Sequence, residues 1–98
     1  MDDLYAREKL ERAAQILATS PKDLHERIFD AVYEIGVLRP EHFSETLRPE
    51  FIELKQIITQ RGSLQETISH LSADELVAVA TRIWRLYEDL TRASPDRE

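Results

Sequence analysis

Apolar residues recur every three to four positions along most of the chain, the period that places them on one face of an α-helix. Polar and turn-forming residues separate these runs, and no run alternates with the period of two that is typical of a strand. The runs predict helices over residues 3–19, 21–35, 44–60, 64–71 and 73–92, the third beginning at Ser44 or Thr46. The pattern therefore predicts an all-α fold, an irregular bundle of about five helices.

The apolar residues that share one face of a predicted helix form a stripe, and these stripes predict the core. On the first helix Ala6, Ala13 and Ala14 share one face, and such small side chains allow a neighbouring backbone to approach closely. The remaining predicted core positions are Leu10, Leu17, Leu24, Ile28, Ala31, Ile35, Leu47, Phe51, Leu54, Ile57, Ile58, Leu64, Ile68, Leu71, Leu76, Val79, Ala80, Ile83, Leu86, Tyr87 and Leu90.

Helix-start signals precede four of the runs. Ser20 stands before Pro21, which predicts a serine cap with proline at the first helical position. Ser63 and Ser72 are each followed three residues later by glutamate, the spacing of a capping box. The pair at residues 2–3, both aspartate, can cap the first helix.

Two glycines mark the expected helix ends. Gly36 and Gly62 each follow a periodic run, where a left-handed residue commonly terminates a helix, so we predict that conformation for both. Between the second and third helices, residues 37–46 form a connector in which Pro40 opens a short helical turn through Phe43.

The composition indicates one acidic domain. A chain of 98 residues, 42% of them hydrophobic, predicts a single helical domain over residues 1–92 with a frayed tail over 93–98. The net charge of −6 has no basic segment to offset it, so neither nucleic acid nor an anionic membrane is an expected partner. The chain contains no cysteine, which excludes disulfides and thiolate chemistry and fits a cytoplasmic protein.

Residues 58–71 resemble the helix-turn-helix segment of bacterial repressors. Ile58 precedes the turn at Gly62, and Thr67, Ile68 and Ser69 follow it at the spacing of a recognition helix. The resemblance implies an alternative function, DNA binding. The predicted recognition helix contains no lysine or arginine, however, and proteins that bind DNA neutralise several phosphates. A plain connection between packed helices is therefore the favoured interpretation.

No catalytic, cofactor or metal site is predicted. His25, His42 and His70 are scattered, and a metal site needs three or four converging ligands. Two glycines 26 positions apart make no phosphate-binding loop, and no nucleophile elbow is present. An enzyme is the third hypothesis, behind a binding protein, since periodicity cannot reveal a cleft.

Two of the predicted helices carry aromatic residues outside their main apolar stripes. Phe29 and Tyr33 lie one turn apart, away from the main stripe of the second helix, and Trp84 borders the stripe of the fifth. They are either additional core residues or an interface, because interface centres favour aromatic side chains. We therefore predict a non-enzymatic interaction or regulatory module whose partner is another protein or a second copy of this chain, a homodimer.

The second half resembles a group of small uncharacterised bacterial helical proteins. The matching stretches are residues 47–51 with Ile57, residues 62–64 with Thr67, residues 71–75, and Ala80, Ile83, Leu86, Tyr87 and Leu90. The resemblance covers residues 22–90 and rests on caps, stripes and turns. It implies a bacterial cytoplasmic protein and brings no activity, cofactor or site residue.

Overall fold

The computed structural model describes residues 3–92, which fold into five α-helices and one short 3-10 helix. The elements in chain order are α1 (Asp3–Thr19), α2 (Leu24–Ile35), η1 (Pro40–His42), α3 (Arg48–Ile58), α4 (Leu64–Ser69) and α5 (Ala73–Arg92). No strand occurs between residues 3 and 92. The predicted all-α bundle is confirmed, and the predicted tail at 93–98 lies outside the described residues.

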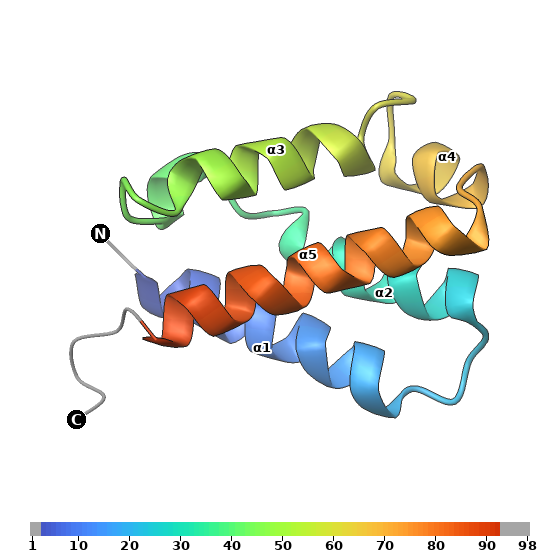
Figure 1. Cartoon of the computed structure of the whole chain (residues 1–98), viewed down its shortest axis with the longest axis horizontal. Helices are drawn as coiled ribbons and strands as arrows, with labels where there is room; N and C mark the ends of the chain where they lie inside the picture. Colours follow the sequence, from blue (N-terminus) through green and yellow to red (C-terminus); the bar gives the residue numbers. More distant parts are fainter. Residues whose placement is uncertain (1–2, 93–98) are drawn as a thin grey trace.

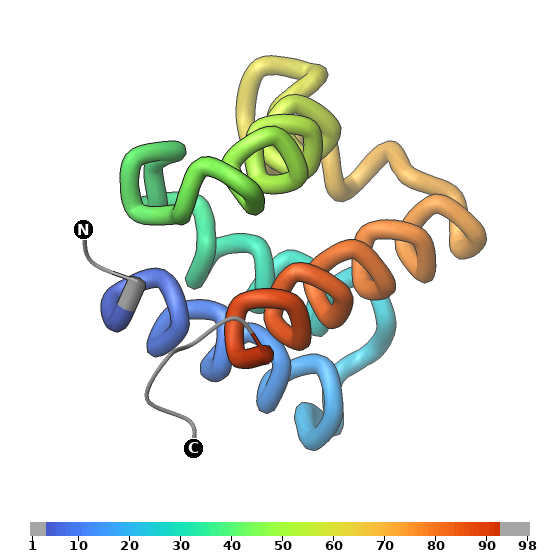
Figure 2. The backbone as a smooth tube through the Cα atoms, turned by 60° about the vertical axis from the view of Figure 1, so that its left-hand side comes forward, coloured from blue at the N-terminus to red at the C-terminus, as the bar shows by residue number. Residues whose placement is uncertain are grey.

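Helix α5 runs through the middle of the molecule (Figure 1), with α3 on one side of it and α1 and α2 on the other. Helix α1 is antiparallel to both α2 and α5, while the short α4 lies at the end of the molecule where α5 begins. The tube view shows the same arrangement from a second direction (Figure 2), with α3 and α1 on opposite sides of α5. A long amphipathic helix can occupy this position because its apolar stripe faces neighbours on two sides.

The stripes supply the core as predicted, apart from a few residues at its edge. Ala6, Ala13 and Ala14 are buried, and α1 packs closely on both α2 and α5. Along α5 the fully buried positions follow the helical period: Leu76, Val79, Ile83, Leu86 and Leu90. The predicted core residues that stay partly accessible while packing against this cluster are Leu17, Leu24, Ile57, Leu64, Ala80 and Tyr87.

The connector between α2 and α3 is fixed by α3. Phe43 stacks on Phe51 with ring centroids 4.5 Å apart, which anchors the predicted turn at Pro40 in the core. The guanidinium of Arg48 donates to the carbonyl oxygens of Pro40 and Phe43, both at 3.0 Å. The ammonium of Lys55 donates to the Leu38 carbonyl at 3.1 Å. The Pro40 carbonyl also accepts from the Phe43 amide at 3.0 Å, so these charge-assisted bonds add to the pairing of the connector and tie it to α3.

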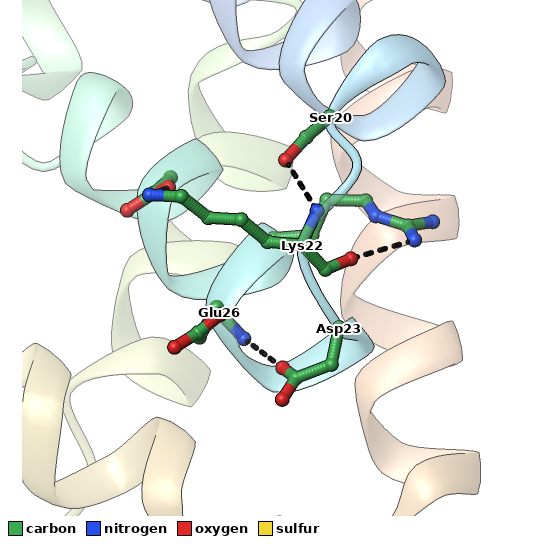
Figure 3. Close-up of polar contacts among 6 residues, drawn as sticks. Ser20, Lys22, Asp23 and Glu26 are labelled. Atoms are coloured by element: carbon green, nitrogen blue, oxygen red, sulfur yellow. Dashed lines mark hydrogen bonds and ion pairs between the residues drawn. The ribbon is translucent and has the colours of Figure 1, made fainter.

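The start of α2 differs from the prediction. Asp23, not Ser20, is its cap: the Asp23 carboxylate accepts from the Glu26 amide at 2.9 Å (Figure 3). Ser20 instead accepts from the Lys22 amide at 3.3 Å, which makes a local turn, and Pro21 lies outside the helix. An aspartate satisfies the first turn as well as a serine does, so proline spacing alone misplaced the boundary by three residues.

Two further predictions at helix ends are wrong, and α3 and α4 each end two residues earlier than predicted, at Ile58 and Ser69. Helix α3 begins at Arg48, later than Ser44 or Thr46, because a turn in which Ser44 accepts from the Leu47 and Arg48 amides precedes it. Gly36 has φ −65°, ordinary right-handed backbone, so the predicted left-handed conformation is wrong there. At Gly62, where φ is +101°, it is confirmed.

The capping boxes differ in completeness. At Ser72 the box is reciprocal: the hydroxyl accepts from the Glu75 amide at 3.2 Å, and the Glu75 carboxylate accepts from the Ser72 amide at 2.8 Å. At Ser63 the hydroxyl accepts from the Glu66 amide at 3.1 Å. The predicted cap at residues 2–3 involves a residue outside the described part of the chain.

Candidate functional site

Phe29 lies at the floor of an open hollow between α2 and α4. The hollow has a volume of about 520 Å³ and is lined by Lys22, His25, Glu26, Phe29, Asp30, Gln65, Ile68 and Ser69. Phe29 is partly buried and packs against the core, and Ile68 is buried beneath it. Helix α2 therefore supplies a partly buried aromatic ring and α4 an aliphatic side chain, although Phe29 and Ile68 are 39 positions apart in the sequence.

The apolar surface continues along α2. The Tyr33 ring lies 6.2 Å from that of Phe29, and 65% of Tyr33 is exposed. Beyond it, a second hollow of about 290 Å³ is lined in part by Tyr33, Val37 and Leu64, and Val37 is 55% exposed. We call this continuous surface the α2–α4 strip, and it consists of Phe29, Tyr33, Val37, Leu64 and Ile68.

One polar contact joins α2 to the segment that follows α4. His25 Nε2 lies 3.2 Å from the carbonyl oxygen of Leu71, just after α4. Since a carbonyl only accepts, this nitrogen carries the hydrogen and donates it. At the edge of the hollow, Lys22 Nζ donates to Asp30 at 3.0 Å, and this bond and the attraction of the carboxylate raise the pKa of Lys22.

Acidic residues outnumber basic ones on α2 and α4, although a lysine lines each hollow, Lys22 the larger and Lys9 the smaller. Helices α2 and α4 carry four carboxylates, from Glu26, Asp30, Glu34 and Glu66, against the single guanidinium of Arg27. Arg27 Nη2 donates to the Lys22 carbonyl at 2.9 Å, and its buried Nε has no hydrogen-bond partner among the described residues. Figure 3 shows the start of α2, where Lys22 and Glu26 are among the residues drawn.

Some of these carboxylates already have partners. Asp30 pairs with Lys22 at 3.0 Å, and Glu34 lies 3.5 Å from Lys9 and 3.9 Å from Arg12. Glu26 and Glu66 form no ion pair among residues 3–92, but the charge of Glu26 adds to the effect of Asp30 in raising the pKa of Lys22. Of these two acids, only Glu26 is among the residues that line the hollow.

No family of known proteins, no curated protein and no solved structure matches this chain. The resemblance to small bacterial helical proteins therefore stays a prediction, and every role assigned to a residue rests on geometry.

Trp84 is separate from the other two predicted interface residues. It lies on α5, 39% exposed, with its ring 6.0 Å from that of Tyr87 in an edge-to-face arrangement. The structure thus divides the three predicted residues between two helices, with Phe29 and Tyr33 together on α2. Helical spacing alone grouped Phe29 with Tyr33 on one helix. Val37, in the predicted connector, and Leu64, on another helix, join them only in the folded structure.

The segment at 58–71 forms a turn between packed helices. Ile58 and Ile68 are buried, and Thr67 is fully buried with its hydroxyl accepting from the Arg61 amide at 3.0 Å. Gln65, Glu66 and Ser69 are exposed on a helix of six residues without a cation. Thr67 is thus used within the fold, and nothing on α4 would neutralise a phosphate.

The histidines are held by separate local contacts. The His42 ring packs edge-on against Tyr5 with centroids 5.1 Å apart, and its Nδ1 accepts from the Arg39 amide. His70 Nδ1 lies 2.8 Å from the Glu66 carbonyl and 3.4 Å from Ser69 Oγ. That nitrogen must donate to the carbonyl, so it cannot also take a proton from the serine.

Among residues 3–92, no three histidine, aspartate or glutamate side chains come together in a way that could hold a metal ion. In the same part of the chain, none of the helices combines the length and the apolar character needed to cross a bilayer.

A carboxyl pair joins α3 to α5. Burial between the helices raises the pKa of Glu50, and the charge of Asp89 and a hydrogen bond with it raise that pKa further. Arg85 and Arg82 act in the opposite direction, and Arg82 also pairs with Glu53 at 3.4 Å. The pair is partly exposed and lines no hollow with the strip, so we assign it to the α3–α5 contact.

Proposed function

We propose that this protein is a non-enzymatic protein–protein interaction or regulatory module that contacts its partner through the α2–α4 strip. The observation that carries the proposal is the pair Phe29 and Tyr33, with rings 6.2 Å apart and Tyr33 65% exposed beside an open hollow. Exposed aromatic rings next to a recess are the usual anchors of protein interfaces, because a partner side chain can fill the recess and exclude water.

The partner is either another protein or a second copy of the chain. A domain of this size gains stability when it covers an apolar face, which supports self-association. Trp84 offers a second aromatic contact on α5 for such an assembly. The location that we propose, the bacterial cytoplasm, rests on the resemblance in residues 22–90.

Site-specific photocrosslinking tests the proposal in the cells that make the protein. Tyr33 is replaced with the photoreactive analogue benzoylphenylalanine, and Ile52, 38% exposed on α3, is replaced in the same way as the control. We expect position 33 to yield one defined crosslinked species, either a dimer of this chain or a complex with another protein. Position 52 should yield none.

Light scattering over a range of concentrations then separates the two kinds of partner. If the strip mediates self-association, Tyr33→Ser should remove the dimer while the melting temperature of the monomer stays unchanged, because the side chain is mostly exposed. A monomeric protein with no crosslink from position 33 would refute the proposed function.

A further inference from the structure

The three histidines of the chain form two different kinds of hydrogen bond. His25 donates from Nε2 to the Leu71 carbonyl at 3.2 Å, and His70 donates from Nδ1 to the Glu66 carbonyl at 2.8 Å. At His42 the direction is reversed, because Nδ1 accepts from the backbone N–H of Arg39 at 2.9 Å. A backbone N–H can only donate, so this ring nitrogen carries no hydrogen in the folded protein.

This difference decides which of the three bonds survives protonation of the ring. An imidazole typically gains its second proton between about pH 8 and about pH 5. His25 and His70 can take the proton on their other ring nitrogen and keep their bonds, since both nitrogens of an imidazolium donate. His42 must take it on Nδ1, where the new N–H would face the N–H of Arg39. Of the three, only the bond at His42 is therefore incompatible with a charged ring.

The bond at His42 closes the short helix η1. It joins the residue before η1 to the last residue of η1, and the His42 amide donates in return to the Arg39 carbonyl at 2.9 Å. The His42 ring also packs edge-on against Tyr5 of α1. We call the bond between the Arg39 amide and His42 Nδ1 the η1 clasp. It fixes both the turn and the orientation of the ring that contacts α1.

Charged and titratable groups lie against η1, or against its ring partner on α1, from three elements. The connector supplies Arg39 and Glu41, which lie 3.8 Å apart, and α3 supplies Arg48, which donates to two connector carbonyls. Helix α1 supplies Tyr5, with Lys9 Nζ 5.9 Å from the centre of its ring. Glu41 is the one carboxylate of this set and pairs with Arg39. The set therefore offers no unpaired anion to an imidazolium at position 42.

A second anchor of the connector does not respond to pH in this range. Phe43 is buried and stacks on Phe51 of α3. The Arg48 guanidinium, which stays charged throughout, donates to the carbonyl oxygens of Pro40 and Phe43. Loss of the clasp would thus leave the connector attached to α3 at Phe43 and would free only the turn at η1.

We propose that the η1 clasp is an acid-sensitive switch, in which protonation of His42 releases the Arg39 amide and loosens the connector between α2 and α3. The clasp contributes to stability while the ring is neutral, and this contribution is lost as the pH falls and the ring gains its proton. The switch is separate from the α2–α4 strip and does not depend on the proposed function.

Nuclear magnetic resonance spectroscopy of the unmodified protein, from about pH 8 to about pH 5, tests the clasp directly. At the upper end, nitrogen chemical shifts of the rings should place the hydrogen on Nε2 of His42 and on Nδ1 of His70. On acidification the Arg39 amide proton should move upfield along the titration curve of the His42 ring, and its protection from hydrogen exchange should fall several-fold. An Arg39 amide that stays in place while His42 titrates would overturn the inference, as would a His42 ring that does not titrate in this range.

A pair of matched variants separates the bond from the other acid-sensitive groups. His42→Asn keeps an acceptor that does not titrate, because the amide oxygen takes the place of Nδ1, so the Arg39 amide should stay in place throughout the range. His70→Asn is the control, since its amide nitrogen can still donate to the Glu66 carbonyl. In that variant the Arg39 amide should titrate as it does in the parent.

Chemical denaturation at the two ends of the pH range measures the effect on the whole fold. On acidification the midpoints of the parent and of His70→Asn should fall further than the midpoint of His42→Asn. Glu50 and Asp89 are present in all of these proteins, so their own pH dependence cancels from the comparison. Equal falls in parent and variants would overturn the inference, because a group other than His42 would then be responsible.

Discussion

Gly36 at the end of α2 lies directly against Leu64 at the start of α4. A Cβ atom at position 36 would stand 3.0 Å from Leu64 Cδ1 and 3.3 Å from the Val32 carbonyl oxygen. The glycine thus leaves room for the Leu64 side chain and is not needed for a special backbone conformation, since its φ is −65°. The same contact closes the Val37 end of the α2–α4 strip.

This relationship predicts coupling between positions 36 and 64. In right-handed backbone, Gly→Ala commonly stabilises a protein by about 0.4–1 kcal/mol through the unfolded chain. With Leu64 present, the tight contact should offset that gain, so Gly36→Ala should change stability little. In the Leu64→Ala background the gain should reappear. Chemical denaturation of the four proteins measures the coupling, and an identical effect of Gly36→Ala in both backgrounds would contradict the contact.

Helix caps give a second prediction, at Ser72. Because its capping box is reciprocal and begins the longest helix, Ser72→Ala should reduce the free energy of unfolding by about 0.5–2 kcal/mol. Chemical denaturation provides the measurement. An unchanged midpoint would mean that the box does not contribute to the start of α5.

A third prediction compares the two candidate caps of α2. Asp23→Ala removes the acceptor of the Glu26 amide and should be destabilising by about 1 kcal/mol. Ser20→Ala removes only a local turn contact at 3.3 Å and should have a smaller effect. The comparison uses denaturation midpoints, and the reverse order would restore Ser20 as the cap.

The Glu50–Asp89 pair predicts a dependence of stability on pH. Because the pKa of Glu50 is raised in the folded state, the folded protein holds this proton more tightly than the unfolded chain does. Its contribution to stability is therefore present below the ordinary glutamate pKa of 4.5 and is lost as pH rises through the higher folded value. Arg82 and Arg85 reduce the effect without reversing it.

Glu50→Gln imitates the protonated side chain and should raise the denaturation midpoint at pH 7 but not at about pH 4. The gain should stay below about 1 kcal/mol, since the pair is partly exposed to solvent. Glu53→Gln, on the same helix but paired with Arg82, is the control and should not stabilise. A gain of equal size at both pH values would exclude the proton as its cause.

The fifth prediction concerns nucleic acid. Since α4 has no cation and the chain has a net charge of −6, binding to duplex DNA should be undetectable at physiological salt. A gel-shift assay with a random-sequence duplex and a pool of sequences checks this. Sequence-specific binding at nanomolar protein would instead support the helix-turn-helix interpretation of residues 58–71.

By itself, the sequence determined the fold class and the interior. Its period of 3.6 residues predicted α1 and α5 at their observed bounds and most buried positions, because burial on a helix follows directly from spacing. Val32, Leu38 and Phe43 are also buried and were not among the predicted core residues. The caps at Ser63 and Ser72 and the left-handed Gly62 were equally local, each depending on a few neighbouring residues.

Only the tertiary structure decided what each surface contains. Ser20 and Asp23 can each cap a helix, and in the structure Asp23 does so. The role of Gly36 depends on Leu64, which is 28 positions away. Phe29 and Tyr33 were identified by spacing, but their union with Val37 and Leu64, and their separation from Trp84, required the placement of α4 beside α2. Helical periodicity describes one element at a time, whereas a binding surface is made where two elements meet.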